Sequence, residues 1–408
     1  MMIFTDLHIH SAHSRATSKD ITLDTLAKYG KIKGISVLGT GDFTHPEWFK
    51  NLKAKLAENE GIYEYEGMKF LLSTEMSLMY SQDGRGRKIH NVILAPSFEI
   101  AEQITEWLKT KGRVDYDGRP IFGFTCPELV ENVMSISKDC VIIPAHIWTP
   151  HFSLFGSLSG FDRIEDCFQE KTKHIHALET GLSSDPGMNW RLSALDRYSL
   201  VSFSDAHSYW PWRLGRECCA FDLKKINYDT ITNAIKTRKN FSFTLEFFPE
   251  EGKYHFDGHR NCNFSSSPEE TKKLNGICPK CKRPLTIGVL NRVEELADRE
   301  PGFRPKGAVD YKSLMPLSEL ISFVIGNDVY TKKVWSVYEI LIERFGNEFA
   351  VLLDASETEL RKLVKDKLVE LIMKNRAGKL KLEPGYDGVY GHLIIEKEKK
   401  EEGLGRFF

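Results

Sequence analysis

Histidines and carboxylates at short, regular spacings are the residues of this sequence that could do chemistry. His8 and His10 stand two positions apart in an apolar segment with the composition of a β-strand. Because side chains alternate faces along a strand, both imidazoles point the same way and can bind one ion. Asp205 and His207 repeat that spacing after a second apolar segment. Imidazole and carboxylate together suit zinc, manganese or iron, so the pattern indicates a metal site.

Such a site requires the segments that carry its residues to converge. Apolar stretches alternate with helix-like stretches over residues 1–245, which predicts parallel βα units of an α/β fold. Strands are predicted at residues 3–9, 35–39, 70–73, 91–95, 141–144, 176–178 and 200–203, and helices at 23–31, 47–58, 99–111 and 128–137. The residues that follow the predicted strands are Asp42, Glu75, His146, Glu179, Asp205 and His207. The carboxyl ends of barrel strands meet at one mouth, so these residues can share a cluster. A lone His-x-His would more often be a chance pair, and the repetition at strand ends is what favours the metal interpretation.

A different metal pattern lies further along the chain. His259 and Cys262 precede Cys278 and Cys281, and this paired spacing is typical of a small structural zinc site. His255 is the alternative fourth ligand. Buried thiols without a metal are the other interpretation, but three cysteines in a polar segment argue against it.

Length and composition place these patterns in a multidomain globular protein. The chain has 408 residues, 41% hydrophobic and 28% charged, and its formal net charge of -1 gives no indication of nucleic-acid binding. Three helices are predicted at 316–325, 334–345 and 357–374, with a capping box at Ser356 and Glu359 and glycine stops at Gly326 and Gly346. We expect a catalytic barrel at 1–245, a zinc-binding module at 246–310, a helical domain at 311–395 and a charged tail at 396–408.

The sequence also predicts a cellular location. It shows no signal peptide and no apolar run long enough for a transmembrane helix. The five cysteines outside the zinc pattern are irregularly spaced in mostly apolar stretches, which predicts buried free thiols in a reducing compartment. We therefore expect a cytoplasmic protein that does not bind membranes.

Several of the metal-competent segments resemble the motifs of the polymerase-and-histidinol-phosphatase (PHP) family of phosphoesterases. The resemblance rests on Asp6-Leu7-His8-Ile9-His10-Ser11, Thr40-Gly41-Asp42, Glu75, His90, Pro144-Ala145-His146 and Ser204-Asp205-Ala206-His207. It implies a distorted seven-stranded β/α barrel with a trinuclear site of zinc, manganese or magnesium. One ion would be held by His8, His10, Glu75 and Asp205, a second by Glu75, His90 and His146, and a third by Asp42 and His207 with His13. The implied catalytic residues are His8, His10, Glu75, His146, Asp205 and His207.

The layout of the whole chain is similar to that of the archaeal endonuclease Q family. A PHP-like barrel, the Cys/His module, the helical segment and the turn-rich segment 384–391 follow one another in that order. The resemblance implies a DNA-repair endonuclease that cuts DNA 5′ to deaminated bases (uracil, hypoxanthine, xanthine) and abasic sites. It also implies a helical DNA-binding domain at 311–395, a metal-activated water and a flipped nucleotide, for which flipping costs least when the base is damaged.

Two loops that follow proposed metal ligands could wall a base pocket or contact DNA. The residues considered are Trp148, His151, Phe152, Ser153, Tyr209, Trp210 and Arg216. Aromatic side chains can stack on bases, but a packed loop core is the alternative for each of them.

Two further interpretations concern partners and competing functions. Leu404, Phe407 and Phe408 have the spacing of a sliding-clamp-binding peptide, with docking on the protein's own surface as the alternative. A small-molecule phosphatase of histidinol-phosphate type would share the metal residues but has no use for a zinc module. A non-catalytic scaffold would have lost metal ligands that are present here.

Overall fold

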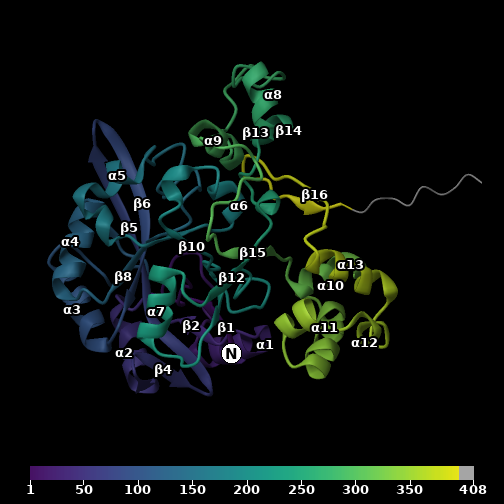
Figure 1. Cartoon of the computed structure of the whole chain (residues 1–408), viewed down its shortest axis with the longest axis horizontal. Helices are drawn as coiled ribbons and strands as arrows, with labels where there is room; N and C mark the ends of the chain where they lie inside the picture. The colour runs from purple at the N-terminus through teal and green to yellow at the C-terminus, as the bar shows by residue number, and fades with distance from the viewer. Residues whose placement is uncertain (395–408) are drawn as a thin grey trace, which may run out of the picture.

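The computed structural model describes residues 1–394, and a mixed sheet of eleven strands lies at its centre (Figure 1). Its strands are β1 (Met2–Asp6), β2 (Val37–Gly39), β3 (Ala57–Asn59), β4 (Ile62–Tyr65), β5 (Met68–Gln82), β6 (Arg85–Ala95), β7 (Ile121–Phe122), β8 (Val141–Pro144), β11 (Cys218–Asp222), β12 (Phe241–Glu246) and β15 (Asp310–Ser313). The main order is β15-β12-β11-β1-β2-β5-β4-β3, while β6 joins β5 to β8. The predicted α/β class is therefore confirmed.

Parallel pairing holds for only part of this sheet. β1, β2 and β5 run parallel, but β6 is antiparallel to both β5 and β8. The cause is a tight turn at Asp83 and Gly84, whose φ angles of 53° and 71° suit the two-residue hairpin turn between twisted strands. The expectation of parallel βα units throughout is wrong here, because this Asp-Gly signal makes β5 and β6 one long hairpin.

β9 (Ala177–Glu179) and β10 (Ser199–Val201) form a separate parallel pair. Backbone hydrogen bonds link this pair to the segment after β8 on one side and to the segment after β1 on the other. On one side the Ile147 amide donates to the Glu179 carbonyl at 3.1 Å. On the other side the His10 amide donates to the Ala206 carbonyl at 3.0 Å. These bonds bring residues from both flanks to the carboxyl ends of the same strands.

Helices cover the outer side of the sheet, as Figure 1 shows for α3 and α4. They are α1 (Leu23–Lys33), α2 (Pro46–Lys55), α3 (Phe98–Lys109), α4 (Cys126–Ile136), α5 (Ile164–Phe168), α6 (Pro186–Asn189) and α7 (Tyr228–Thr237). The Ser97 side chain accepts a hydrogen bond from the Ile100 amide at the start of α3, and the Thr125 side chain accepts one from the Glu128 amide at the start of α4. Each cap satisfies one backbone donor that has no partner within its helix. The four helices predicted in this region are present within a few residues of the expected bounds. No helix in residues 1–394 is long and apolar enough to cross a membrane.

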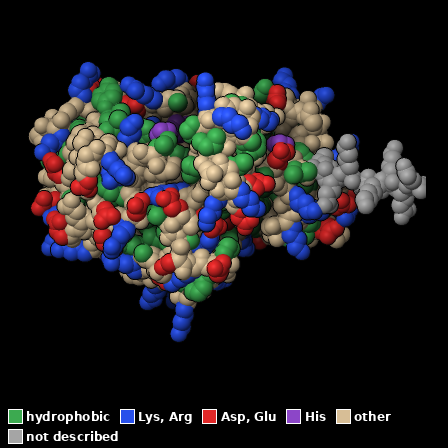
Figure 2. All heavy atoms as spheres, turned by 90° about the horizontal axis from the view of Figure 1, so that it is seen from above, with side chains coloured by type: hydrophobic (Ala, Val, Ile, Leu, Met, Phe, Trp, Pro, Cys, Tyr) green, Lys and Arg blue, Asp and Glu red, His purple; other side chains and the backbone are tan. Residues whose placement is uncertain are grey.

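Apart from β15, which belongs to the central sheet, the described chain beyond residue 246 forms two smaller parts. The first contains β13 (Asp257–His259), β14 (Phe264–Ser266), α8 (Pro268–Lys273) and α9 (Val289–Leu296). The second contains α10 (Leu317–Ile325), α11 (Lys332–Phe345), α12 (Glu357–Arg361) and α13 (Asp366–Arg376), followed by the pair β16 (Leu382–Glu383) and β17 (His392–Leu393). Basic and acidic side chains are mixed over the face seen in Figure 2, consistent with a net charge near zero.

The helix predicted at 357–374 is two helices, because Lys365 is extended and α13 starts afresh at Asp366. Leu360, Leu368 and Val369 are all buried, so the apolar spacing continues across the break and hides it from the sequence. The predicted stops at Gly326 and Gly346 are confirmed, with φ angles of 72° and 90°.

A buried ion pair joins the helical part to the part that contains the central sheet. Lys33 on α1 donates to a Glu348 carboxylate oxygen at 2.7 Å, and both side chains are at most 2% exposed. The other oxygen of Glu348 accepts from the Tyr338 hydroxyl at 2.7 Å, and the Leu317 amide donates to this carboxylate at 3.1 Å. Both oxygens of the Glu348 carboxylate therefore have hydrogen-bond partners, as a buried carboxylate requires.

Candidate metal centre

Glu75 lies at the centre of two groups of side chains that could hold metal ions. Its Oε2 is 3.2 Å from His10 Nε2 and 3.6 Å from His8 Nε2. Its Oε1 is 2.6 Å from His90 Nδ1 and 3.2 Å from His146 Nε2. The groups are His8, His10, Glu75 and Asp205, and Glu75, His90 and His146, with the ligand atoms of each within 4.8 Å of one another. The two sets match the first two ligand sets that the sequence resemblance implies.

The position of Glu75 in its strand differs from the prediction. The sequence suggests that Glu75 follows a strand that ends at residue 73, whereas β5 continues to Gln82 and Glu75 pairs with Val92 in mid-strand. His90 lies on β6, so this hairpin carries ligand candidates of both groups. Consecutive residues of both strands are buried, among them the polar Ser73, Thr74 and Ser77 of β5, so a run of apolar residues underestimates the length of the strand.

Two further carboxylates orient the paired histidines. Glu179 accepts from His8 Nδ1 at 2.9 Å, and Asp42 accepts from His10 Nδ1 at 3.0 Å. Since an ionised carboxylate can only accept, each Nδ1 carries a proton, so in the neutral form of each ring the lone pair available to a metal ion is on Nε2, which faces Glu75. The Nε2 of His8 is buried without a hydrogen-bond partner among the described residues, and it lies 3.6 Å from Asp205. This donor set, with outer carboxylates behind the imidazoles, fits a divalent ion.

The electrostatics of the site favour a bound cation. Burial opposes a charge on His8, but Glu179 and Glu75 outweigh it and raise its pKa well above the usual value. Burial likewise opposes ionisation of Glu75, but His90 and Arg119 hold its pKa well below the usual value. A metal ion, like a proton, places positive charge at the imidazole lone pair. The carboxylates that raise the proton affinity of His8 therefore also favour a bound metal ion.

Left-handed backbone conformations occur at three residues of this site. The φ angles are 47° at Asp42, 30° at His146 and 47° at Asp205, in a region that residues with a Cβ rarely occupy. Phe152, whose ring centroid is 4.8 Å from that of His90, has a φ of 59°. Strain of this kind persists where surrounding structure enforces it, typically at functional sites.

The residues expected to hold a third ion are not brought together in the described part of the chain. Asp42 Oδ1 is engaged by His10, and its Oδ2 accepts from the Ser11 amide at 2.6 Å and the Ser14 hydroxyl at 2.8 Å. His13 stacks on the His45 ring at 4.1 Å instead of facing Asp42. His207 remains beside the first group, with its Nδ1 2.8 Å from the Asp205 carbonyl oxygen. In this arrangement Asp42 positions His10, because both of its oxygens are already engaged.

A third group that could hold a metal lies in the module around β13 and β14. His259, Cys262, Cys278 and Cys281 have ligand atoms within 4.8 Å of one another, and His259 Nδ1 is 3.2 Å from the Cys281 sulfur. Desolvation would raise the pKa of Cys278, but backbone N–H groups at Cys281 and Lys280 and neighbouring side chains lower it to about 6. A thiolate in a set of one imidazole and three sulfurs is the chemistry of a structural zinc site.

Replacing Cys281 by Ser is expected to remove the ion of this module and to unfold it locally. Structural zinc sites need four ligands and contribute folding free energy directly. Elemental analysis should show about one zinc ion per chain fewer than in the unmodified protein. Replacing the buried Cys140 by Ser is the matched control, and an unchanged zinc content in Cys281→Ser would contradict this assignment.

His255, the alternative zinc ligand, lies elsewhere. It is 6% exposed and stacks on Phe256, and burial lowers its pKa to about 4 despite a backbone hydrogen bond at Pro249. The unfolded chain therefore binds the proton first, and the stability that neutral His255 contributes is present above pH 6.5 and lost as the pH falls toward 4.

His255→Gln should therefore weaken the pH dependence of unfolding between pH 6.5 and 4. The difference in unfolding free energy between variant and unmodified protein should change across that window by on the order of 3 kcal/mol. Urea unfolding at a series of pH values measures this. If the unfolding free energies of the two proteins change with pH in the same way, the pKa of His255 is not lowered by folding.

Two of the seven residues predicted to wall a base pocket or contact DNA are buried inside the protein. Trp148 is 1% exposed, and its Nε1 donates to Asn189 at 2.8 Å. Ser153 is fully buried and donates to the Thr149 carbonyl. For Trp148 and Ser153 the structure therefore agrees with the packed-loop alternative. The exposed His151 and the half-buried Phe152 lie between these two residues in the sequence, and the Phe152 ring contacts His90 directly.

The second predicted loop packs against the helical part. Trp210 stacks on Trp212 with centroids 4.9 Å apart and lies 5.2 Å from Trp335 on α11. Tyr209 lies 5.1 Å from Tyr29 on α1. Arg216, the predicted phosphate contact, has its guanidinium carbon 5.4 Å from the Phe247 ring. These aromatic contacts hold the loop against its own chain.

Arg119 is a site residue to which no sequence pattern points. Its Nη1 donates to Glu75 Oε2 at 3.0 Å from a loop between α3 and β7. The segment Asp117-Gly118-Arg119-Pro120 contains only a turn-like composition. A single arginine in a long loop forms no sequence motif, so the sequence does not indicate which residue it contacts.

Solved structures of similar proteins decide the family. The crystal structure of the lesion-specific endonuclease PfuEndoQ from Pyrococcus furiosus is 32% identical, has a TM-score of 0.88, and matches over 98% of this chain and 96% of that one. The chain belongs to the endonuclease Q family. A second structure, endonuclease Q with a 27-mer duplex carrying an abasic lesion at the active site, is 31% identical, with a TM-score of 0.87 and coverage of 99% and 100%.

Sequence relatives of this endonuclease Q family member carry less functional information. The family model "MJ0043 C-terminal domain" matches residues 316–379, the region of α10 to α13. The uncharacterised protein MJ0043 of Methanocaldococcus jannaschii is 39% identical over 263 residues. That match covers 62% of this chain but only 32% of the length of MJ0043.

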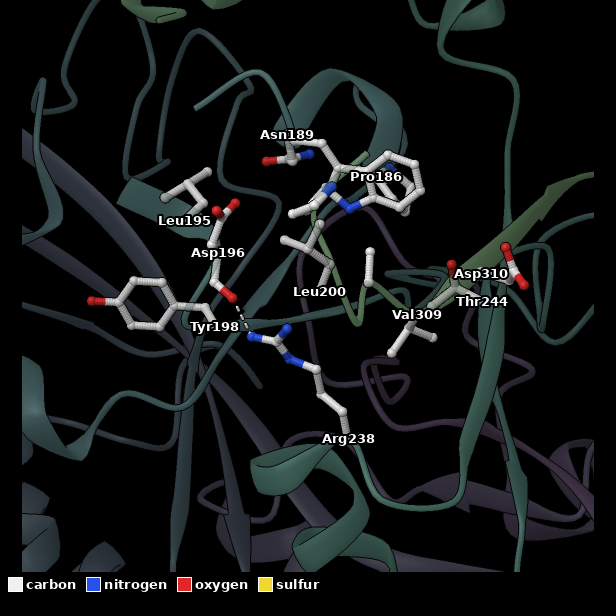
Figure 3. A pocket seen from close by; sticks show the side chains of 13 residues that line it. Pro186, Asn189, Leu195, Asp196, Tyr198, Leu200, Arg238, Thr244, Val309 and Asp310 are labelled. Atoms are coloured by element: carbon white, nitrogen blue, oxygen red, sulfur yellow. Dashed lines mark hydrogen bonds between the residues drawn. The ribbon is translucent and has the colours of Figure 1, made fainter. Parts of the chain in front are cut away.

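A small cavity elsewhere in this endonuclease Q fold is unrelated to the metal groups (Figure 3). It lies beside β10 and is lined by residues that include Leu195, Tyr198, Leu200 and Arg238. Arg238 donates to the Asp196 carbonyl within it. Its volume of about 20 Å³ has room for little more than one water molecule. None of its lining residues belongs to a metal group.

Proposed function

We propose that this chain is a metal-dependent DNA-repair endonuclease that hydrolyses the phosphodiester 5′ to deaminated bases and abasic sites. The observation that carries the proposal is the pair of metal-competent groups that share Glu75. The family supports it, because a relative of 31% identity has been crystallised with an abasic duplex at its active site. Uracil, hypoxanthine and xanthine are the deaminated bases that we expect it to accept.

The chain's own side chains would prepare the site for hydrolysis. His8, His10, Glu75 and Asp205 would hold one ion, and Glu75, His90 and His146 the second. Bound ions of this kind would lower the pKa of a bound water to about 7 and offset charge on the transferring phosphoryl group. Glu179 and Asp42 keep His8 and His10 in the tautomer that presents Nε2. A third ion at Asp42, His207 and His13 would require Asp42 to release His10.

Finer structural assignments accompany this proposal. We infer that β1, β2, β5, β6, β8, β9 and β10 close into the distorted seven-stranded barrel, because hydrogen bonds link the β9–β10 pair to both flanks. The module at 246–310 would hold structural zinc, and the helical domain at 311–395 would contact DNA.

Leu404, Phe407 and Phe408 lie outside the described residues, so sliding-clamp binding stays a prediction. Calorimetry with purified clamp, using the full chain and a chain truncated at residue 395, would test it.

Substrate size distinguishes this function from the small-molecule phosphatase. The purified protein should be supplied with manganese, magnesium or zinc and offered either a duplex with one deoxyuridine or a phosphorylated alcohol such as histidinol phosphate. We expect turnover of the duplex alone. Release of inorganic phosphate from the small ester without any cleavage of DNA would support the phosphatase instead.

A further inference from the structure

We propose that Arg119 contacts a non-bridging oxygen of the scissile phosphate and is a catalytic residue of this nuclease. The inference rests on the proposed function and adds to it a group outside the metal ligands. Arg119 donates one N–H to Glu75 Oε2, the oxygen that faces His8 and His10. No other side chain among residues 1–394 accepts from its guanidinium, and 21% of the side chain is exposed. Four of the five donors of the guanidinium fork thus remain for a ligand that enters from solvent.

The loop that carries Arg119 is fixed on both sides. The Gly118 amide donates to the His13 carbonyl at 3.1 Å, and the Ser77 amide on β5 donates to the Pro120 carbonyl at 3.1 Å. Asp117 is 2% exposed and accepts from the Arg15 and Arg119 amides at 3.2 and 3.1 Å. An arginine held this way loses little conformational freedom when it binds a ligand, which is the purpose of a preorganised donor.

Gly118 shows that the loop is built against the metal centre. A Cβ at this position would lie 2.2 Å from Asp42 Oδ2 and 2.5 Å from the Ser14 hydroxyl oxygen. No other residue fits there without displacing the carboxylate that orients His10. Because the Gly118 backbone lies this close to Asp42, the next residue, Arg119, lies at the edge of the ligand groups.

The charge of Arg119 needs an anion beyond Glu75. Two divalent ions would bring four positive charges, which are balanced by the carboxylates in and directly behind the two groups, Glu75, Asp205, Asp42 and Glu179. Arginine cannot lose its proton, so it adds a further charge to that site. A phosphodiester, with two non-bridging oxygens in a planar arrangement that a guanidinium matches, is the ligand that offsets this excess.

In the reaction, Arg119 would stabilise charge without exchanging a proton. The water oxygen forms a bond to phosphorus and the bond from phosphorus to the leaving ester oxygen breaks. The water loses one proton and the leaving oxygen gains one, so the products are one phosphate monoester and one alcohol. Charge on the non-bridging oxygens grows during this displacement, and fixed donors at that position act mainly on the transition state.

The test compares Arg119→Ala and Arg119→Lys with Arg113→Ala, an exposed arginine of the same loop that pairs with Asp115. We expect Arg119→Ala to lower kcat on lesion DNA by about 10²- to 10³-fold, as for removal of a transition-state donor. KM, metal content and metal-free binding of lesion DNA should stay within about threefold. Added guanidinium should restore part of the activity of Arg119→Ala, and Arg119→Lys should remain impaired because lysine cannot make the fork geometry.

Two results would overturn this assignment while leaving the nuclease proposal intact. If Arg119→Ala keeps kcat within about threefold of the active unmodified protein, the side chain does not act on the phosphate. If the variant loses its ions and guanidinium does not rescue it, Arg119 only supports Glu75. An unmodified protein that does not cut lesion DNA would instead contradict the proposed function itself.

Discussion

Replacing Glu75 by Gln is expected to abolish measurable cleavage of lesion DNA, with a loss of about 10³-fold or more. The carboxylate contributes one oxygen to each metal group, so a single substitution weakens both. Metal ions supply several kcal/mol of transition-state stabilisation, and each 1.4 kcal/mol is a factor of ten in rate. Single-turnover cleavage and elemental analysis together measure the effect, and the zinc of the Cys/His module should be retained.

The control for this substitution is Glu64→Gln on the neighbouring strand β4. Glu64 is exposed and pairs with Lys69 at the surface, so its replacement should change neither cleavage nor metal content. A Glu75→Gln protein that keeps its active-site ions and cleaves within about threefold of normal would contradict the central role of this carboxylate.

The largest stability effect is expected for Glu348→Ala, at about 3–5 kcal/mol of unfolding free energy. The substitution leaves the ammonium of Lys33 buried without its anion, and it removes the acceptor of the Tyr338 hydroxyl and the Leu317 amide. Urea unfolding followed by tryptophan fluorescence suits this measurement, because Trp210, Trp212 and Trp335 pack where the two parts meet.

Two comparisons separate the buried pair from ordinary surface charge. Glu357→Ala removes an exposed ion pair with Arg361 and should cost at most about 1 kcal/mol. The double variant Lys33→Met with Glu348→Gln should recover most of the loss, because no unpaired charge remains. A cost below about 1 kcal/mol for Glu348→Ala would show that Lys33 finds solvent or another acceptor.

Sequence patterns predicted the ligand candidates best where backbone geometry fixes side-chain direction. The predicted strand at 3–9 is shorter in the structure, where β1 ends at Asp6, but Ile9 forms a parallel β-bridge with Ala206, and both His8 and His10 lie beside Glu75 and Asp205. His259 and the three cysteines converge as their spacing predicts. These features depend on local rules that any β-strand or zinc turn obeys.

The remaining features depend on contacts between distant segments. Asp42 looks like a ligand in the sequence, but hydrogen bonds from Ser11 and Ser14 hold it behind His10. Trp210 looks like a stacking platform, but Trp335, more than a hundred residues later, packs against it. Arg119 has no pattern at all, because its role follows from where a loop is fixed. Residue types alone therefore could not separate ligands from the residues that position them.

Mapping the products of one labelled duplex tests the central claim most directly. A duplex with a single abasic site, labelled on the damaged strand, should be incubated with the purified protein and manganese, magnesium or zinc. We expect one nick, at the phosphodiester immediately 5′ to the lesion, which requires added ion and is absent with Glu75→Gln. An intact duplex under every ion, or cleavage that ignores the position of the lesion, would contradict it.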